Sequence, residues 1–153
     1  MRRRKDDAQP VASQNARFAL ADVQDAAELR RRLRRFLAHG DSVVRRSGLT
    51  PQRYLLLLSV KGAPDGSETR TIGGIAGDLQ LAQSSATELV DRAEAAGLIV
   101  RTTAPHDGRV VTISLSEDGQ ARFAAAFAAL AEDRVELLTY LDHARSHLAR
   151  HGL

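Results

Sequence analysis

One segment of this 153-residue chain places two helical patterns and a strand pair in an order that few folds share. Thr71 precedes apolar residues spaced three or four apart, which indicates a short helix whose first turn the threonine hydroxyl caps. Those residues are Ile72, Ile75, Ala76 and Leu79. After a two-residue link, a second helix is predicted over 82–96, and Gly97 follows where a helix end favours a left-handed residue. The segment therefore predicts a helix-turn-helix.

A β-hairpin is predicted directly after the second helix. Strands are expected over 98–103 and 110–115, and the second alternates apolar with polar residues. Pro105, Asp107 and Gly108 between them are turn-forming residues. The order helix, short helix, helix and hairpin predicts a winged helix-turn-helix core, in a fold that is mainly α with a small β-hairpin (α+β).

Helical patterns also flank this core. An amphipathic helix begins near Asp22, and its end is either Gly40 or Gly48. Thr50-Pro51 is a strong start for a helix over 51–60, since proline fits the first helical position. From Glu117 the chain is helical again, with an interruption of the pattern at 131–134.

The apolar stripes of the terminal helices exceed what one small core covers, so we expect them to form a homodimer interface. The predicted organisation is a single domain overall, divided into four segments. These are a mobile N-terminal arm (1–16), an N-terminal dimerisation helix (17–48), a DNA-binding lobe (49–116) and C-terminal dimerisation helices (117–153).

Composition removes several classes of function. The absence of cysteine excludes disulfides, thiol catalysis and cysteine-ligated metal. The sequence shows no catalytic triad, paired catalytic carboxylates or phosphate-binding glycine loop, so neither an enzyme nor a cofactor is expected. No apolar run reaches a membrane span and the first ten residues lack a signal-peptide pattern, which favours a cytoplasmic protein. The formal net charge is +3, and most of the basic residues are arginine, whose guanidinium group suits phosphate contacts.

The face of the 82–96 helix opposite Ala86 and Ala93 is polar. Hydroxyl, amide and acidic groups on such a face are able to read base edges, whereas the plain alternative is an ordinary solvated surface. With Arg101 of the hairpin, the DNA-binding candidates here are Gln83, Ser84, Ser85, Thr87, Glu88 and Arg92.

The turn of the hairpin carries three further candidates. Arg109 suits a narrow minor groove, where the potential is most negative. Asp107 is expected to orient Arg109 through a carboxylate pair. His106 is left open between a groove contact and a plain loop residue.

The run from Leu49 to Gly119 resembles the MarR family of bacterial regulators. The resemblance lies in LTPQRYLLLLSV, in IAGDLQLAQSSATELVDRAEAAGLIVR and in HDGRVVTISLSEDG. It implies a homodimer that binds palindromic double-stranded DNA, mostly as a repressor, and responds to a small, often aromatic or phenolic effector. Two departures stand out. Ala82 occupies a position where the family usually has a capping residue, so the helix start is expected to shift to Ser84 or Ser85, the latter forming a capping box with Glu88. The helix from Glu117 is also shorter than usual.

Two further groups of residues are candidates for binding. Phe18, Phe36, Tyr54 and Phe123 are candidates to line an effector cavity, although such spacing is more often core. His143, His147 and His151 share one helical face, which allows a metal-responsive regulator, but solvent-facing histidines near a helix end are the favoured interpretation and no metal is expected. A protein-interaction module without DNA binding is the other alternative.

Overall fold

The computed structural model describes residues 19–104 and 107–150, with side chains left out at 104, 107–109 and 148–150. The predicted arm and the candidates Phe18, His106 and His151 lie outside these ranges. Within them the fold is mainly helical with one antiparallel hairpin, as predicted. The elements are α1 (Leu20–Arg46), α2 (Pro51–Lys61), α3 (Ile72–Leu79), α4 (Gln83–Ala95), β1 (Ile99–Ala104), β2 (Asp107–Leu115), α5 (Glu117–Ala129) and α6 (Ala131–Arg150).

Side-chain caps begin three of the helices. The hydroxyl of Thr50 accepts a hydrogen bond from the backbone N–H of Arg53 at 3.3 Å, and that of Thr71 accepts from Gly74 at 3.1 Å. Ser116 starts α5 in the same way. The caps predicted at Thr50 and Thr71 are thus confirmed, because each satisfies a first-turn N–H that has no partner within its helix.

One modest prediction follows from the cap of α2. Thr50→Ala removes the acceptor of the Arg53 N–H, so we expect a loss of about 1 kcal/mol of unfolding free energy. Thermal unfolding followed by circular dichroism measures it, with Thr50→Ser, which keeps the hydroxyl, as the control. Equal stability of the two variants would contradict the capping role.

The structure settles the open end of α1 and corrects the start of α4. Helix α1 passes through Gly40 and ends at Arg46. The predicted shift of the α4 start to Ser84 or Ser85 is wrong, because the helix begins at Gln83 with Ala82 as an N-cap that makes no side-chain hydrogen bond. The buried Ala86 packs into the core and donates its N–H to the Ala82 carbonyl at 3.0 Å, so packing sets the start.

The hairpin and the C-terminal helices differ in detail from the prediction. Strand β1 begins at Ile99, one residue after the predicted start. Leu98 is instead a core residue whose N–H donates to the Ala93 carbonyl and whose carbonyl accepts from the Ser116 N–H. Strand β2 begins at Asp107 and is longer than predicted. The predicted interruption at 131–134 is wrong, because these residues form the start of α6, and the break between α5 and α6 is the single buried residue Leu130.

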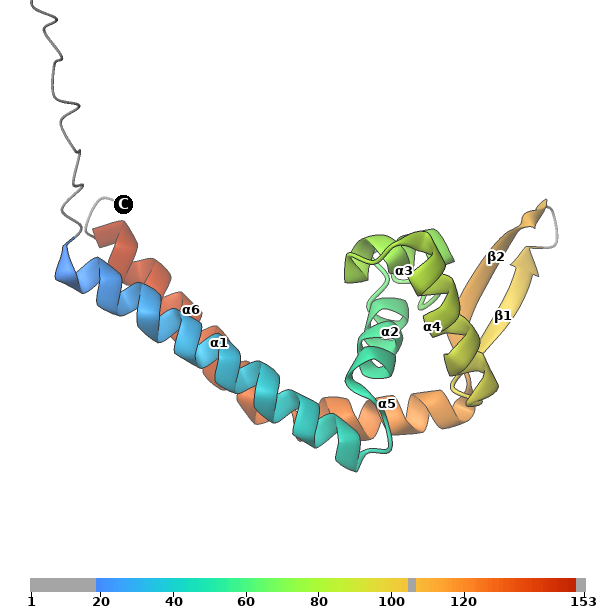
Figure 1. Cartoon of the computed structure of the whole chain (residues 1–153), viewed down its shortest axis with the longest axis horizontal. Helices are drawn as coiled ribbons and strands as arrows, with labels where there is room; N and C mark the ends of the chain where they lie inside the picture. The colour runs from blue at the N-terminus through green and yellow to red at the C-terminus, as the bar shows by residue number, and fades with distance from the viewer. Residues whose placement is uncertain (1–18, 105–106, 151–153) are drawn as a thin grey trace, which may run out of the picture.

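The molecule has a compact lobe and an extended helix pair (Figure 1). Helices α2, α3 and α4 form the lobe with the hairpin at its side, whereas α1 and α6 lie against each other and extend away from it. The core of the lobe contains Leu56, Leu57, Ile75, Val90 and Ile113, all essentially unexposed. None of the helices in the described ranges has both the length and the apolar character that crossing a bilayer requires.

Candidate nucleic-acid interface

Helix α4 presents a polar surface on the side away from the core. Its inner side is buried through Ala86, Leu89, Val90 and Ala93. Most of the predicted DNA-binding residues of this helix are exposed: Gln83, Ser84, Ser85, Glu88 and Arg92. The helix therefore offers amide, hydroxyl, carboxylate and guanidinium groups to solvent.

Two of the α4 candidates already have partners within the helix. Thr87 is half-buried and donates its hydroxyl to the Gln83 carbonyl at 2.9 Å, so only its acceptor capacity and methyl group face outward. Glu88 lies 3.5 Å from the Arg92 guanidinium, one helical turn away. This pair is exposed and weak, so it leaves both groups available.

Arg101 joins the hairpin to α4. Its guanidinium pairs with the carboxylate of Asp91, and its Nε lies 3.3 Å from the carboxylate of Glu94 without hydrogen-bond geometry. The side chain is only 29% exposed. The structure therefore shows Arg101 held between β1 and α4. The sequence analysis did not predict this role, although the spacing of Asp91 and Glu94 places both carboxylates on one face of the helix.

A second arginine holds the other side of the hairpin. Arg70 exchanges both backbone hydrogen bonds with Ile113 of β2, and its side chain donates two hydrogen bonds to Asp78 of α3 at 2.9 and 2.7 Å. Ser59 of α2 donates to the same carboxylate at 2.6 Å. The Arg70 guanidinium, and then the Ser59 hydroxyl, hold the pKa of Asp78 below its usual range. This network ties α2, α3 and β2 together.

The hairpin projects beyond α4 at the far end of the lobe (Figure 1). Asp107 and Arg109 lie in the first part of β2, and their side chains are outside the described residues. Their predicted roles in the groove and in orienting the arginine remain predictions.

An apolar cavity of about 210 Å³ lies where α1, α2, α5 and α6 meet. Of the four predicted lining residues, Phe36 and Tyr54 line it. Phe123 does not, because it stacks on Tyr54 with ring centroids 5.8 Å apart and belongs to the core. Burial raises the pKa of the Tyr54 hydroxyl. The polar groups at the wall are those of Asp41 and Arg134, and the Arg134 guanidinium lies 3.7 Å from the centre of the Phe127 ring.

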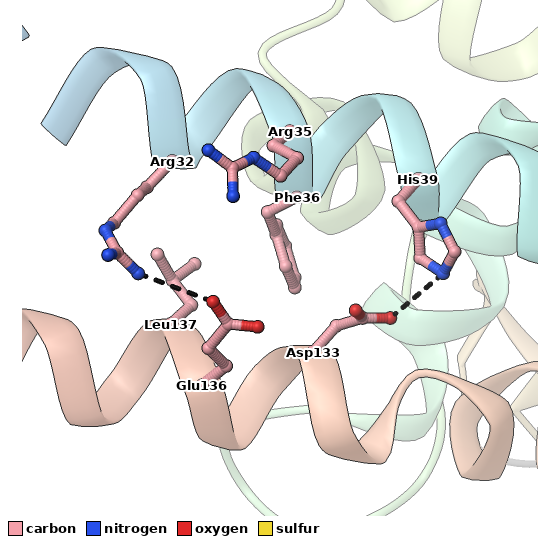
Figure 2. A pocket seen from close by; sticks show the side chains of 7 residues that line it. All are labelled: Arg32, Arg35, Phe36, His39, Asp133, Glu136 and Leu137. Carbon is pink, nitrogen blue, oxygen red and sulfur yellow. Dashed lines mark hydrogen bonds and ion pairs between the residues drawn. The ribbon is translucent and has the colours of Figure 1, made fainter. Parts of the chain in front are cut away.

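A second pocket, with charged side chains among its lining residues, lies between α1 and α6. Figure 2 shows Arg32 and His39 of α1 reaching Glu136 and Asp133 of α6, with Phe36 between them. The two contacts are 3.4 and 3.5 Å long. Both contacts are partly exposed to solvent, so they add little to the stability of the helix pair.

The histidine face of α6 was the alternative metal site. The Nδ1 atom of His143 lies 2.8 Å from the Thr139 carbonyl, and that of His147 lies 3.7 Å from a carboxylate oxygen of Asp25. Within residues 19–104 and 107–150, no group of three potential metal ligands comes together.

Helix α4 follows α3 after a three-residue turn, and the hairpin lies beside its polar outer side. This arrangement defines a winged helix-turn-helix protein. The MarR family model matches residues 47–110, from the end of α1 into β2. The match confirms the predicted resemblance, so residues 47–110 of this chain are similar to the MarR family. Members of this family are transcription regulators and not enzymes.

Solved structures agree on the fold. AbsC of Streptomyces coelicolor, a MarR family transcriptional regulator, superposes with a TM-score of 0.66 at 19% identity, over 88% of this chain and 95% of that one. A mutant of S. aureus MepR bound to an oligodeoxyribonucleotide gives 0.59 at 17% identity, over 87% and 95%. Bordetella bronchiseptica BpsR gives 0.52 at 19% identity, over 76% and 82%. No curated protein matches the chain.

Proposed function

We propose that the protein is a homodimeric, sequence-specific transcriptional repressor of the cytoplasm that binds double-stranded DNA. The observation that carries this proposal is the exposed polar side of α4, with the hairpin held beside it by Arg101. A helix of this width fits a major groove, and a hairpin next to it reaches the adjacent minor groove. The related fold of MepR, bound to an oligodeoxyribonucleotide, supports the proposal.

Each candidate residue has a separate task in this proposal. The polar side chains at the start of α4 contact base edges, since this end of a recognition helix enters the groove. They are Gln83, Ser84, Ser85, Thr87 and Glu88. Arg92 contacts phosphate, Arg109 enters the minor groove, Asp107 orients Arg109, and His106 contacts the groove beside it.

Two copies are expected to associate through α1 and α6. Leu37 is 63% exposed and Leu138 is 65% exposed, and Val135 and Leu141 add apolar surface on the same pair of helices. Burying such side chains is favourable by about 25 cal/mol per Å² of apolar area. A twofold dimer prefers a palindromic site with half-sites about 34 Å apart.

An effector site is proposed in the apolar cavity between the helix pair and the lobe. The cavity offers the Phe36 and Tyr54 rings to an aromatic or phenolic compound, and Arg134 and Asp41 as polar partners. An occupant there contacts both α1 and α2, so its binding is coupled to the placement of the lobe. BpsR, whose DNA binding is regulated by 6-hydroxynicotinic acid, supports this part of the proposal.

Selection of bound duplexes from a random pool tests the proposal as a whole. We expect enrichment of a palindrome, which establishes sequence-specific binding and twofold symmetry together. A protein that retains no duplex at low salt is not a DNA-binding regulator, and the alternative of a protein-interaction module then replaces this proposal.

Arg109→Ala tests the wing. We expect affinity to fall about fivefold for all duplexes, and the slope of log affinity against log salt to become shallower by about one, because one phosphate-neutralising cation is lost. Fluorescence anisotropy at several salt concentrations measures both. Arg31→Ala, which removes an exposed arginine paired with Glu28 on α1, is the control. An unchanged salt slope excludes Arg109 from the interface.

For Arg101 we propose a positioning role in place of direct DNA contact. Arg101→Ala releases the hairpin and leaves Asp91 and Glu94 without their cation, so we expect about tenfold weaker DNA binding. Adding Asp91→Asn and Glu94→Gln to this variant removes the repulsion and recovers part of the loss. No recovery, together with a shallower salt slope, would assign Arg101 to a phosphate contact instead.

A further inference from the structure

An open concavity of about 490 Å³ lies where the end of α1, the start of α2 and the last turns of α4 meet. It shares only Pro51 with the lining of the apolar cavity, and its α4 residues, Leu89 and Arg92, follow the predicted base-reading end of that helix. We name it the arginine pocket, lined by Arg45, Thr50, Pro51, Gln52, Arg53, Leu89 and Arg92.

The charged residues that line the arginine pocket are all positive. Its lining holds three guanidinium groups, each from a different helix, and no carboxylate. In the described part of the chain, neither Arg45 nor Arg53 forms an ion pair, and Arg92 has only the 3.5 Å contact with Glu88. Like charges gathered at one concavity repel each other, so a bound anion stabilises this arrangement.

One of the three guanidinium groups is already held in place. The Nη2 atom of Arg53 donates to the carbonyl of Arg92 at 3.3 Å, which fixes the side chain between α2 and α4. Arg53 is also half-buried. A guanidinium restrained in this way loses less conformational entropy when it binds, and its planar fork matches the paired oxygens of a phosphate.

We propose that the arginine pocket binds a phosphate group. Three guanidinium groups suit a compact anion with two or three acceptor oxygens better than a single carboxylate. The phosphate has two possible sources, a small soluble phosphate and the backbone of bound DNA, and the second rests on the proposed function. An occupied pocket bridges α1, a predicted dimerisation helix, to α4, so phosphate restrains their relative placement.

Variants of Arg45 and Arg53 in the full-length protein test the proposal. Isothermal titration with pyrophosphate, in a phosphate-free buffer of low ionic strength, tests the small-molecule source. If this source is right, Arg45→Gln and Arg53→Gln each weaken binding at least fivefold. Arg31→Gln is the matched control, because Arg31 lies on α1 but pairs with Glu28 far from the pocket. Two separate variants keep the test valid if one of them fails to fold.

Salt titrations of duplex binding test the second source. If the phosphate belongs to DNA, pyrophosphate does not bind, and Arg45→Gln makes the salt slope shallower by about one while Arg31→Gln does not. If both pocket variants behave like Arg31→Gln in both experiments, the arginine pocket is not a phosphate site. A wild-type protein that binds pyrophosphate but no duplex contradicts the proposed function and leaves the pocket supported.

Discussion

Gly119→Ala is expected to destabilise the fold by about 3 kcal/mol, which corresponds to a loss of roughly 6–12 °C in melting temperature. A Cβ at this position comes within 1.9 Å of the carbonyl oxygen of Leu98, a backbone atom that cannot rotate away. Gly119 is buried in the first turn of α5, and the same Leu98 carbonyl accepts the N–H of Ser116. The substitution therefore separates α5 from the start of the hairpin.

Chemical denaturation of the two variants Gly119→Ala and Gly77→Ala measures this effect against a matched control. Gly77 is an exposed glycine inside α3, and a Cβ there meets no atom within 4 Å. We expect Gly77→Ala to stabilise the protein by up to about 1 kcal/mol, because alanine is the better helix former. Similar stability of the two variants would show that α5 does not pack on Leu98 as described.

Leu138→Glu is expected to convert the proposed dimer to monomers, with a dissociation constant raised at least hundredfold, an estimate on the order of 3 kcal/mol. Leu138 is 65% exposed on α6, and a twofold axis brings a carboxylate from each copy into the buried interface. Because a palindrome is held by both lobes at once, DNA affinity falls with the dimer. Analytical ultracentrifugation over a range of concentrations measures the change.

Val100→Glu provides the comparison for that experiment. Val100 is 48% exposed, but it lies on β1, away from the helix pair. We expect this variant to remain dimeric at the concentrations where Leu138→Glu is monomeric. If Leu138→Glu also remains dimeric, α6 is not the dimer interface.

Local chemistry made much of the lobe predictable. Thr50 and Thr71 cap helices with their own hydroxyls, and Gly97 ends α4 at a φ of +70°, a conformation that glycine adopts without strain. Each of these helix boundaries depends on residues within about one helical turn of each other. Periodicity placed Ala86 and Ala93 inside and the candidates of α4 outside for the same reason.

Contacts between distant segments were not predictable. The start of α4 depends on how Ala86 packs, and this overrode the better capping residues Ser84 and Ser85. Likewise, the sequence places Arg70 in a loop and gives no partner for Arg101. In the structure, Arg70 pairs with Asp78 and Arg101 pairs with Asp91. Sequence periodicity describes one element at a time and carries no information on such partners.

The single residue between α5 and α6, Leu130, couples the direction of one helix to that of the other. Leu130 is buried and the residues on both sides of it are helical. No flexible linker therefore separates the two helices, and a change in the direction of α5 also moves α6. Helix α6 has 20 residues and is therefore about 30 Å long, so tilting it by about 10° at Leu130 displaces its far end by about 5 Å. In a twofold assembly held at α6, a small swing of each lobe about this pivot alters the distance between the two α4 helices.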